Sequence, residues 1–307
     1  MRVLLGLSVA SALRLALAFV IDTKRATVCN GRAELCNRSY GNITFIGAHD
    51  SFAESEDPFA LARDQDVDIT TQLNDGVRLL QAQSHMNNGV LHFCHTNCIL
   101  FDGGTVLDYL KTVKSWLDAH PTEVLTLLFT NPEGVSIPGV WAPAFDLSGV
   151  AAMAYIPPNM PMKQSDWPTL GELLGNGTRV VVFMDAGADG ADGSVPFILP
   201  EFQMIWETPY GFTDATFPCS VNRTSGPLDT TDHMYMINHS LNVDIIFSLT
   251  VSDPIEASVT NSVDSILANA YGCTQFANGR APNFILLDWV DVGQAYQAAD
   301  ILNGFRT

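Results

Sequence analysis

A histidine and an aspartate stand together where an apolar stretch of this sequence ends. Residues 44–48 have the composition of a short buried strand, and His49 and Asp50 follow directly. Later strand-like stretches also end in polar side chains, namely Gln81 and Gln83, His95, Asp185 and Asp288. In a (β/α)8 barrel such side chains would converge, because the carboxyl ends of all strands meet at one mouth. Two histidines at one mouth indicate general acid and base chemistry, since imidazole exchanges protons near neutral pH.

Strand-like and helix-like segments alternate along the chain. Strands are expected at residues 44–48, 77–83, 90–94, 124–130, 179–184 and 284–287, with weaker candidates at 203–206 and 234–237. Apolar residues at helical spacing predict helices over residues 106–119, 169–174, 254–270 and 292–302, and a short one over 69–75. This alternation predicts a parallel sheet covered by helices, which we expect to close into a TIM-type (β/α)8 barrel of irregular form.

The first residues have the features of a secretory signal. Arg2 precedes an apolar run that ends in a small-x-small cleavage pattern, so residues 1–18 are interpreted as a signal peptide. Lys24 and Arg25 form a dibasic pair, which makes residues 19–25 a candidate propeptide and residues 26–307 the expected barrel domain. No other window of the sequence is long and apolar enough to cross a bilayer. The chain is therefore predicted to be secreted.

The cysteines and glycosylation sequons agree with an oxidising, secretory compartment. Six cysteines form an even set, for which proximity favours Cys29–Cys36, Cys94–Cys98 and Cys219–Cys273, although other pairings stay open. Cys94 and Cys98 lack the second cysteine or histidine pair that a zinc site needs. Sequons that predict N-glycans occur at Asn37, Asn42, Asn176, Asn222 and Asn238.

Composition and charge exclude several classes of protein. The chain is 47% hydrophobic and 16% charged, which is typical of a globular protein with a large core and not of a disordered one. Its 33 acidic and 15 basic residues give a formal charge of −18, which opposes binding to nucleic acid or to an anionic membrane through a basic patch. No Walker loop or dinucleotide fingerprint is present, so no organic cofactor is expected, and a metal requirement stays open.

Several motifs, in their order and spacing, resemble the X-domain of phosphatidylinositol-specific phospholipase C, especially its secreted fungal relatives. The motifs are GAHDS at 47–51, QLNDGVR at 72–78, LHFCH at 91–95 and PNFILLD at 282–288. The resemblance implies that His49 removes a proton from the hydroxyl next to the phosphodiester and that His95 protonates the leaving oxygen. It also implies that Asp288 fixes the tautomer of His49. Asp50 would polarise the attacking hydroxyl or hold the turn.

Two glutamines depart from the family pattern. Bacterial members have an aspartate and an arginine at the end of the second strand, and calcium-dependent members have acidic ligands there, whereas this chain has Gln81 and Gln83. By strand parity both point into the barrel, so they are expected to meet substrate. Asp185 is expected either to contact substrate or to cap the loop that follows it. An amide does not replace a bidentate arginine–phosphate contact. The developing charge would therefore meet a lysine or arginine from elsewhere, a metal ion or little compensation, and the level of activity depends on which of these applies.

Three functions remain open at this stage. The first is a secreted phosphoric diester hydrolase or lyase that resembles phospholipase C and cleaves a phosphoinositide-like or other lipid phosphodiester by two-histidine catalysis. The second is a glycerophosphodiester- or sphingolipid-type phosphodiesterase. The third is a catalytically weak barrel that acts as a secreted binding glycoprotein. His92 and His85 are the rivals of His95, which we favour because it lies inside the expected Cys94–Cys98 loop.

Overall fold

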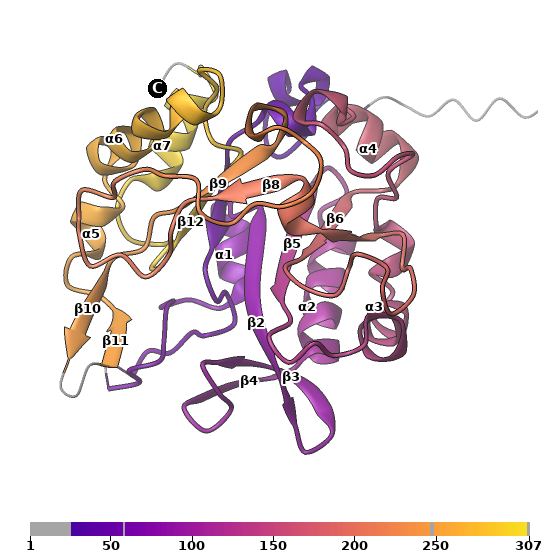
Figure 1. Cartoon of the computed structure of the whole chain (residues 1–307), viewed down its shortest axis with the longest axis horizontal. Coiled ribbons are helices and arrows are strands. Elements are labelled where there is room, and N and C mark those ends of the chain that lie inside the picture. Colours follow the sequence, from indigo (N-terminus) through magenta and orange to yellow (C-terminus); the bar gives the residue numbers. More distant parts are fainter. Residues whose placement is uncertain (1–25, 58, 246–248, 306–307) are drawn as a thin grey trace, which may run out of the picture.

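Eight strands form one curled parallel sheet. The computed structural model describes residues 26–57, 59–245 and 249–305, so the expected signal peptide (1–18) and propeptide (19–25) lie outside the described residues. The strands are β1 (Phe45–Ala48), β2 (Leu79–Asn87), β5 (Leu125–Thr130), β6 (Val180–Met184), β7 (Ile198–Pro200), β8 (Ile205–Glu207), β9 (Met234–Asn238) and β12 (Phe284–Leu287). Their order is β7-β6-β5-β2-β1-β12-β9-β8 (Figure 1). In the described part of the chain β7 and β8 do not pair, so the barrel is irregular, as expected.

Helices pack on the outer side of this sheet. They are α1 (Ile69–Asp75), α2 (Val106–Ala119), α3 (Ala142–Ser148), α4 (Leu170–Asn176), α5 (Ala257–Thr260), α6 (Val263–Cys273) and α7 (Ala295–Leu302). Alternate strand residues point to opposite faces, so Leu80 and Leu127 pack outward against helices, whereas Leu79, Leu128 and Phe183 form a second core inside the barrel. Inward positions beyond this inner core are therefore free to form a polar site at the mouth.

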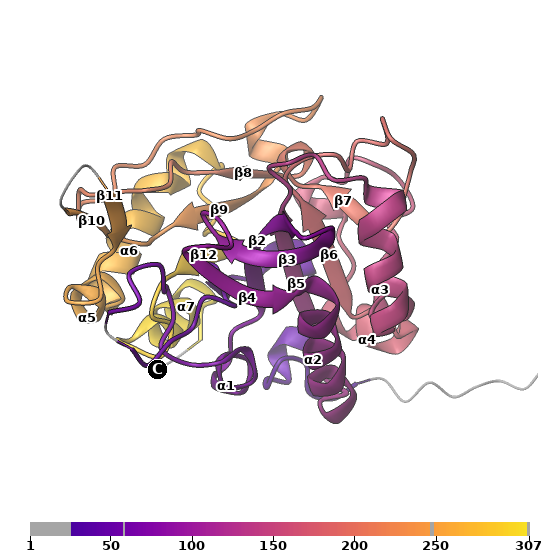
Figure 2. The same ribbon diagram turned by 90° about the horizontal axis from the view of Figure 1, so that it is seen from below.

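The predicted strand at residues 90–94 is not a barrel strand. β3 (Val90–His95) pairs antiparallel with the long strand β2 and with β4 (Phe101–Thr105), and these strands form an extension at the barrel mouth (Figure 2). The cause is the tight turn at Asn88 and Gly89, whose φ angles of +50° and +81° match the hairpin turn that Asn-Gly favours. The β10 (Asn242–Ile245) and β11 (Leu249–Ser252) hairpin lies outside the parallel sheet.

The predicted long helix at residues 254–270 is divided in two. α5 ends before Asn261, and Ser262 begins α6 by accepting a hydrogen bond from the Ser265 amide. The side chain of Asn261 explains the break, because its Nδ2 donates to the carbonyls of Asp288 (2.9 Å) and Trp289 (3.0 Å). At this interruption Asn261 therefore holds the segment that follows β12 through hydrogen bonds.

All three predicted disulfides are present. Cys29 is bonded to Cys36, Cys94 to Cys98, and Cys219 to Cys273. Among the described residues, no helix is long and apolar enough to cross a membrane.

One of the five sequons is buried inside the barrel. Asn37, Asn42, Asn176 and Asn222 are exposed, whereas Asn238 is 4% exposed. The Nδ2 of Asn238 donates to Glu207 Oε2 (3.1 Å) and to the Thr208 carbonyl (2.9 Å), so both of its amide hydrogens are bonded within the fold. The prediction of a glycan at Asn238 is therefore wrong for this fold. Glycopeptide mapping of the protein should find sugar only at the exposed sequons, and a glycan at Asn238 would contradict this placement.

Candidate active site

His49 and Asp50 emerge from the end of β1 into the barrel mouth. The β1 register with β12 continues through His49, whose amide donates to the Leu287 carbonyl (2.9 Å). His49 continues the alternation of β1 and lies on the inner face of the sheet, as Phe45 and Gly47 do. Asp50 has φ +34°, a left-handed conformation that aspartate tolerates better than most residues, and this turn brings its buried carboxylate beside the imidazole.

Asp288 holds His49 in one orientation. His49 Nδ1 lies 2.8 Å from Asp288 Oδ1, and Ser252 donates to the other oxygen of that carboxylate. A carboxylate accepts, so neutral His49 has its proton on Nδ1 and a lone pair on Nε2. Burial lowers the pKa of His49, but the negative charges of Asp288, Asp50 and Asp64 outweigh burial and raise the pKa to about 10.

His95 faces His49 across the same cavity. The two ring centroids are 6.4 Å apart, and Asp50 Oδ2 lies 3.9 Å from His49 Nε2 and 3.8 Å from His95 Nε2. His95 Nδ1 lies 2.9 Å from the Ala62 carbonyl and 3.2 Å from Asp64 Oδ2. Burial lowers the pKa of His95, but the Asp64 and Asp50 carboxylates outweigh it, so the pKa is raised.

Both glutamines and Asp185 line this cavity, which has a volume of about 510 Å³. Gln81 Oε1 accepts from the Asp50 amide (2.7 Å), and Gln83 Oε1 accepts from the Thr96 amide (2.8 Å). These oxygens therefore hold the segments that carry Asp50 and His95. Asp185 accepts from the Asn131 amide (2.7 Å), so it caps a loop while it also borders the cavity.

Arg223 supplies the cavity with the cation that Gln81 and Gln83 lack. It lines the same cavity, forms an ion pair with the buried Glu207 and lies over the ring of Tyr210, 4.6 Å from its centroid. Sequence reasoning missed this residue because it lies in an irregular segment. One signal could have found it, because Arg223 is the only lysine or arginine between Arg179 and Arg280.

Asp64 is the second residue that sequence reasoning missed. It belongs to two groups whose ligand atoms lie within 4.8 Å of one another, one with His49 and Asp288 and one with Asp50 and His95. Either group could hold a metal ion.

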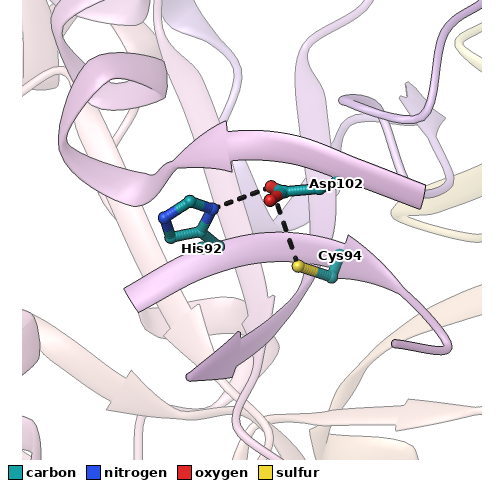
Figure 3. Close-up of side chains that lie close together, drawn as sticks. All are labelled: His92, Cys94 and Asp102. Atoms are coloured by element: carbon teal, nitrogen blue, oxygen red, sulfur yellow. Dashed lines mark hydrogen bonds and ion pairs between the residues drawn. The ribbon is translucent and has the colours of Figure 1, made fainter. Parts of the chain in front are cut away.

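The rival histidines lie elsewhere. Figure 3 shows His92 beside Asp102 on the β3–β4 extension. His92 Nδ1 lies 2.8 Å from Asp102 Oδ1. Cys94 Sγ is 3.9 Å from the same oxygen, but this sulfur is bonded to Cys98 and is not a thiolate ligand for a metal. His85 pairs with Glu133 (2.9 Å). Neither His85 nor His92 is among the described residues that line the cavity.

Comparisons with known proteins converge on one family. The PI-PLC X 1 family model matches residues 35–303. An "uncharacterized secreted protein" of Arthroderma benhamiae is 42% identical over 90% of this chain, which spans 64% of that relative's length. A "PI-PLC X domain-containing protein 1" of the same fungus is 40% identical and matches over 92% of each chain.

Solved structures agree on the fold. A variant of the phosphatidylinositol-specific phospholipase C of Staphylococcus aureus superposes with a TM-score of 0.58 at 17% identity, covering 88% of this chain and 94% of that one. The enzyme of the same name from Listeria monocytogenes superposes with a TM-score of 0.56 at 13% identity, covering 89% of this chain and 96% of that one.

Proposed function

Because the chain belongs to the PI-PLC X-domain family, we propose that it is a secreted phosphoric diester hydrolase or lyase of the phospholipase C type. Its substrate would be a phosphoinositide-like or other lipid phosphodiester with a hydroxyl beside the phosphate. The observation that carries the proposal is the pair of imidazoles, 6.4 Å apart, on one cavity that also holds an arginine.

The proposed reaction begins with proton transfer to His49. Its Nε2 takes the hydroxyl proton, and that oxygen forms a new bond to phosphorus. The bond from phosphorus to the leaving oxygen breaks, and His95 Nε2 gives this oxygen a proton, which yields a cyclic phosphodiester and an alcohol. Arg223 would meet the charge that develops on the phosphoryl oxygens. Asp185, Gln81 and Gln83 are proposed to contact substrate at the cavity wall.

An assay on defined substrates tests this proposal. The purified protein is incubated with phosphatidylinositol, with a glycerophosphodiester and with sphingomyelin, each with and without EDTA, and phosphorus NMR identifies the products. We expect a cyclic phosphate from phosphatidylinositol and no effect of EDTA. Strong inhibition by EDTA would instead indicate a metal at the Asp64 groups, and turnover of only the other diesters would favour the second class of phosphodiesterase. No turnover by folded protein would leave a binding glycoprotein.

The activity should depend on pH with an alkaline optimum. Because the pKa of His49 is raised to about 10, its imidazole is charged at pH 7 in the free protein, and the pKa of His95 is raised as well. In the reactive form His49 has lost the proton on Nε2 while His95 keeps its own. Because His49 must lose this proton, kcat/KM should rise as the pH increases above neutrality. Asp288→Asn removes the largest charge that raises the pKa of His49, and the rising limb should move to lower pH while the maximum falls. A profile with an acidic optimum would contradict this assignment.

Large apolar side chains near the mouth favour a lipid substrate over a soluble one. Phe59 is 85% exposed and Ile99 is 97% exposed, and they lie close in sequence to Ala62 and His95. Exposed apolar groups of this size commonly mark an interaction surface. Ile99→Asp and Phe59→Asp should lower activity on phosphatidylinositol vesicles and leave activity on a short-chain soluble diester unchanged. Val259→Asp is the control, since Val259 is 61% exposed on α5.

A further inference from the structure

Another cavity lies at the opposite end of the barrel from His49 and Asp288. It has a volume of about 320 Å³ and is bordered by the residues just before β1, those just before β12 and those at the end of α7. Because His49 and Asp288 follow the carboxyl ends of the same two strands, this cavity is on the floor of the barrel. Figure 1 shows α7 far from the β3–β4 extension at the mouth. Cavities that hold small ligands begin at roughly 300 Å³, so this one has room for a sugar ring.

Asn42 stands at the edge of the floor cavity. It is the last residue of the short helix η2 (Tyr40–Asn42), it is exposed, and it borders the cavity. No other residue in the described part of the chain forms a hydrogen bond with its side-chain amide. Thr44, which completes the sequon, is 5% exposed, and its hydroxyl donates to the Pro282 carbonyl (2.6 Å). The sequon is therefore built into the floor, and a glycan on Asn42 begins beside the cavity.

The walls of the floor cavity keep polar groups that the fold does not use. Arg38 donates from Nη1 to a backbone carbonyl after α7 (2.7 Å), and Arg280 donates from Nη2 to two carbonyls that precede β9 (2.9 and 2.8 Å). Neither arginine forms an ion pair with a carboxylate of the described residues, and a guanidinium has five N–H donors, so donors remain on both. Gln164 donates from Nε2 to the Gly41 carbonyl, which leaves its Oε1 as an acceptor.

These groups match the chemistry of the sugar that joins an N-glycan to its asparagine. N-acetylglucosamine has hydroxyl groups and an acetamido group around its edge and apolar C–H groups on its faces. The guanidinium groups can donate to its oxygens, and Gln164 Oε1 can accept from a hydroxyl or from the acetamido N–H. Ile43 and the buried Pro282 provide an apolar wall for a face of the ring. The sugar is uncharged, so it enters without the cost of burying a further charge.

We propose that the floor cavity holds the first sugar of an N-glycan on Asn42. Attachment beside the cavity gives the sugar a high effective concentration, so weak contacts are sufficient to hold it. The docked sugar connects η2 with the residues that precede β12 and those that follow α7, and so links the two ends of the barrel domain. Because the floor is remote from His49 and His95, this site does not depend on the proposed activity.

The first test measures how easily the sugar can be reached. The full-length protein is secreted from yeast, and its high-mannose glycans are cut by endoglycosidase H between the first and second sugars. Mass spectrometry follows the cut at Asn42 and at Asn176, which ends α4 and is not among the described residues that line the cavity. In the native protein the cut at Asn42 should be slower by about tenfold or more, because a bond exposed in a tenth of the molecules reacts at a tenth of the rate. After reduction and unfolding, the two rates should be equal.

The second test removes the sugar and examines the cavity walls. Asn42→Gln should lower Tm by about 2–4 °C, the shift expected when a domain of this size loses about one hydrogen bond. Amide hydrogen exchange should become faster at residues 41–44 and 302–304, and Asn176→Gln should change neither measurement. If Asn42→Gln does not fold, Asn42→Asp takes its place, because it also removes the sugar. Equal cutting at Asn42 and Asn176 in the native protein, an Asn42 without sugar, or unchanged exchange at the walls would overturn the proposal.

Discussion

Replacing His49 with alanine should lower turnover of a phosphatidylinositol substrate by about 10²–10⁴-fold, and His95→Ala should do the same, because a general acid or base typically contributes that factor. The two losses should differ in one respect. Without the base at His49 every substrate is affected, whereas a substrate with a good leaving group should lose little when the acid at His95 is absent. Steady-state kinetics on both kinds of substrate measure this difference.

The rival histidines provide matched controls. His92 and His85 each contact a carboxylate near the same hairpin, at 2.8 Å and 2.9 Å, but neither lines the cavity. His92→Ala and His85→Ala should therefore keep activity within a factor of about three, since substitutions away from a site usually have small effects. A loss at His92 as large as that at His95 would refute the assignment of the acid.

The parts of the site that could be predicted from sequence are those fixed by strand periodicity. His49 and Asp288 directly follow β1 and β12, and a period of two places them on the inner face with Gly47 and Leu286. The paired register of these strands then brings the two side chains to 2.8 Å without any further information. Local pattern was sufficient here because each residue is one step beyond a regular element.

The parts that could not be predicted come from irregular segments. Asp64 contacts His95 from a loop, although the two are 31 residues apart in sequence. Arg223 contacts Glu207 from another loop, 16 residues away. No periodic pattern in the sequence links either pair. The hairpin was different, because Asn88-Gly89 between two strand-like runs is a local signal that was missed. The carboxylate and the cation that complete the site therefore depend on the folded chain, whereas the hairpin is indicated by the two residues of its turn.

Arg223→Gln should lower turnover by about 10²–10³-fold on every phosphodiester substrate, because a preorganised cation at developing charge contributes on this scale. Arg223→Lys should recover part of the rate, since it keeps the charge but not the fork geometry that binds two phosphoryl oxygens. KM should change less than kcat if the contact strengthens as charge develops in the transition state.

The buried partner of Arg223 requires its own control. Glu207 is 1% exposed and pairs with Arg223, so removing the arginine alone leaves a buried charge without its partner and should destabilise the fold. Adding Glu207→Gln to Arg223→Gln removes that charge, and thermal unfolding should recover while turnover stays low. If activity recovers together with stability, Arg223 serves the fold and the charge on the phosphoryl oxygens is met by another group. If only stability recovers, the guanidinium acts on the reaction itself and takes the role of the arginine that bacterial members have where this chain has Gln83.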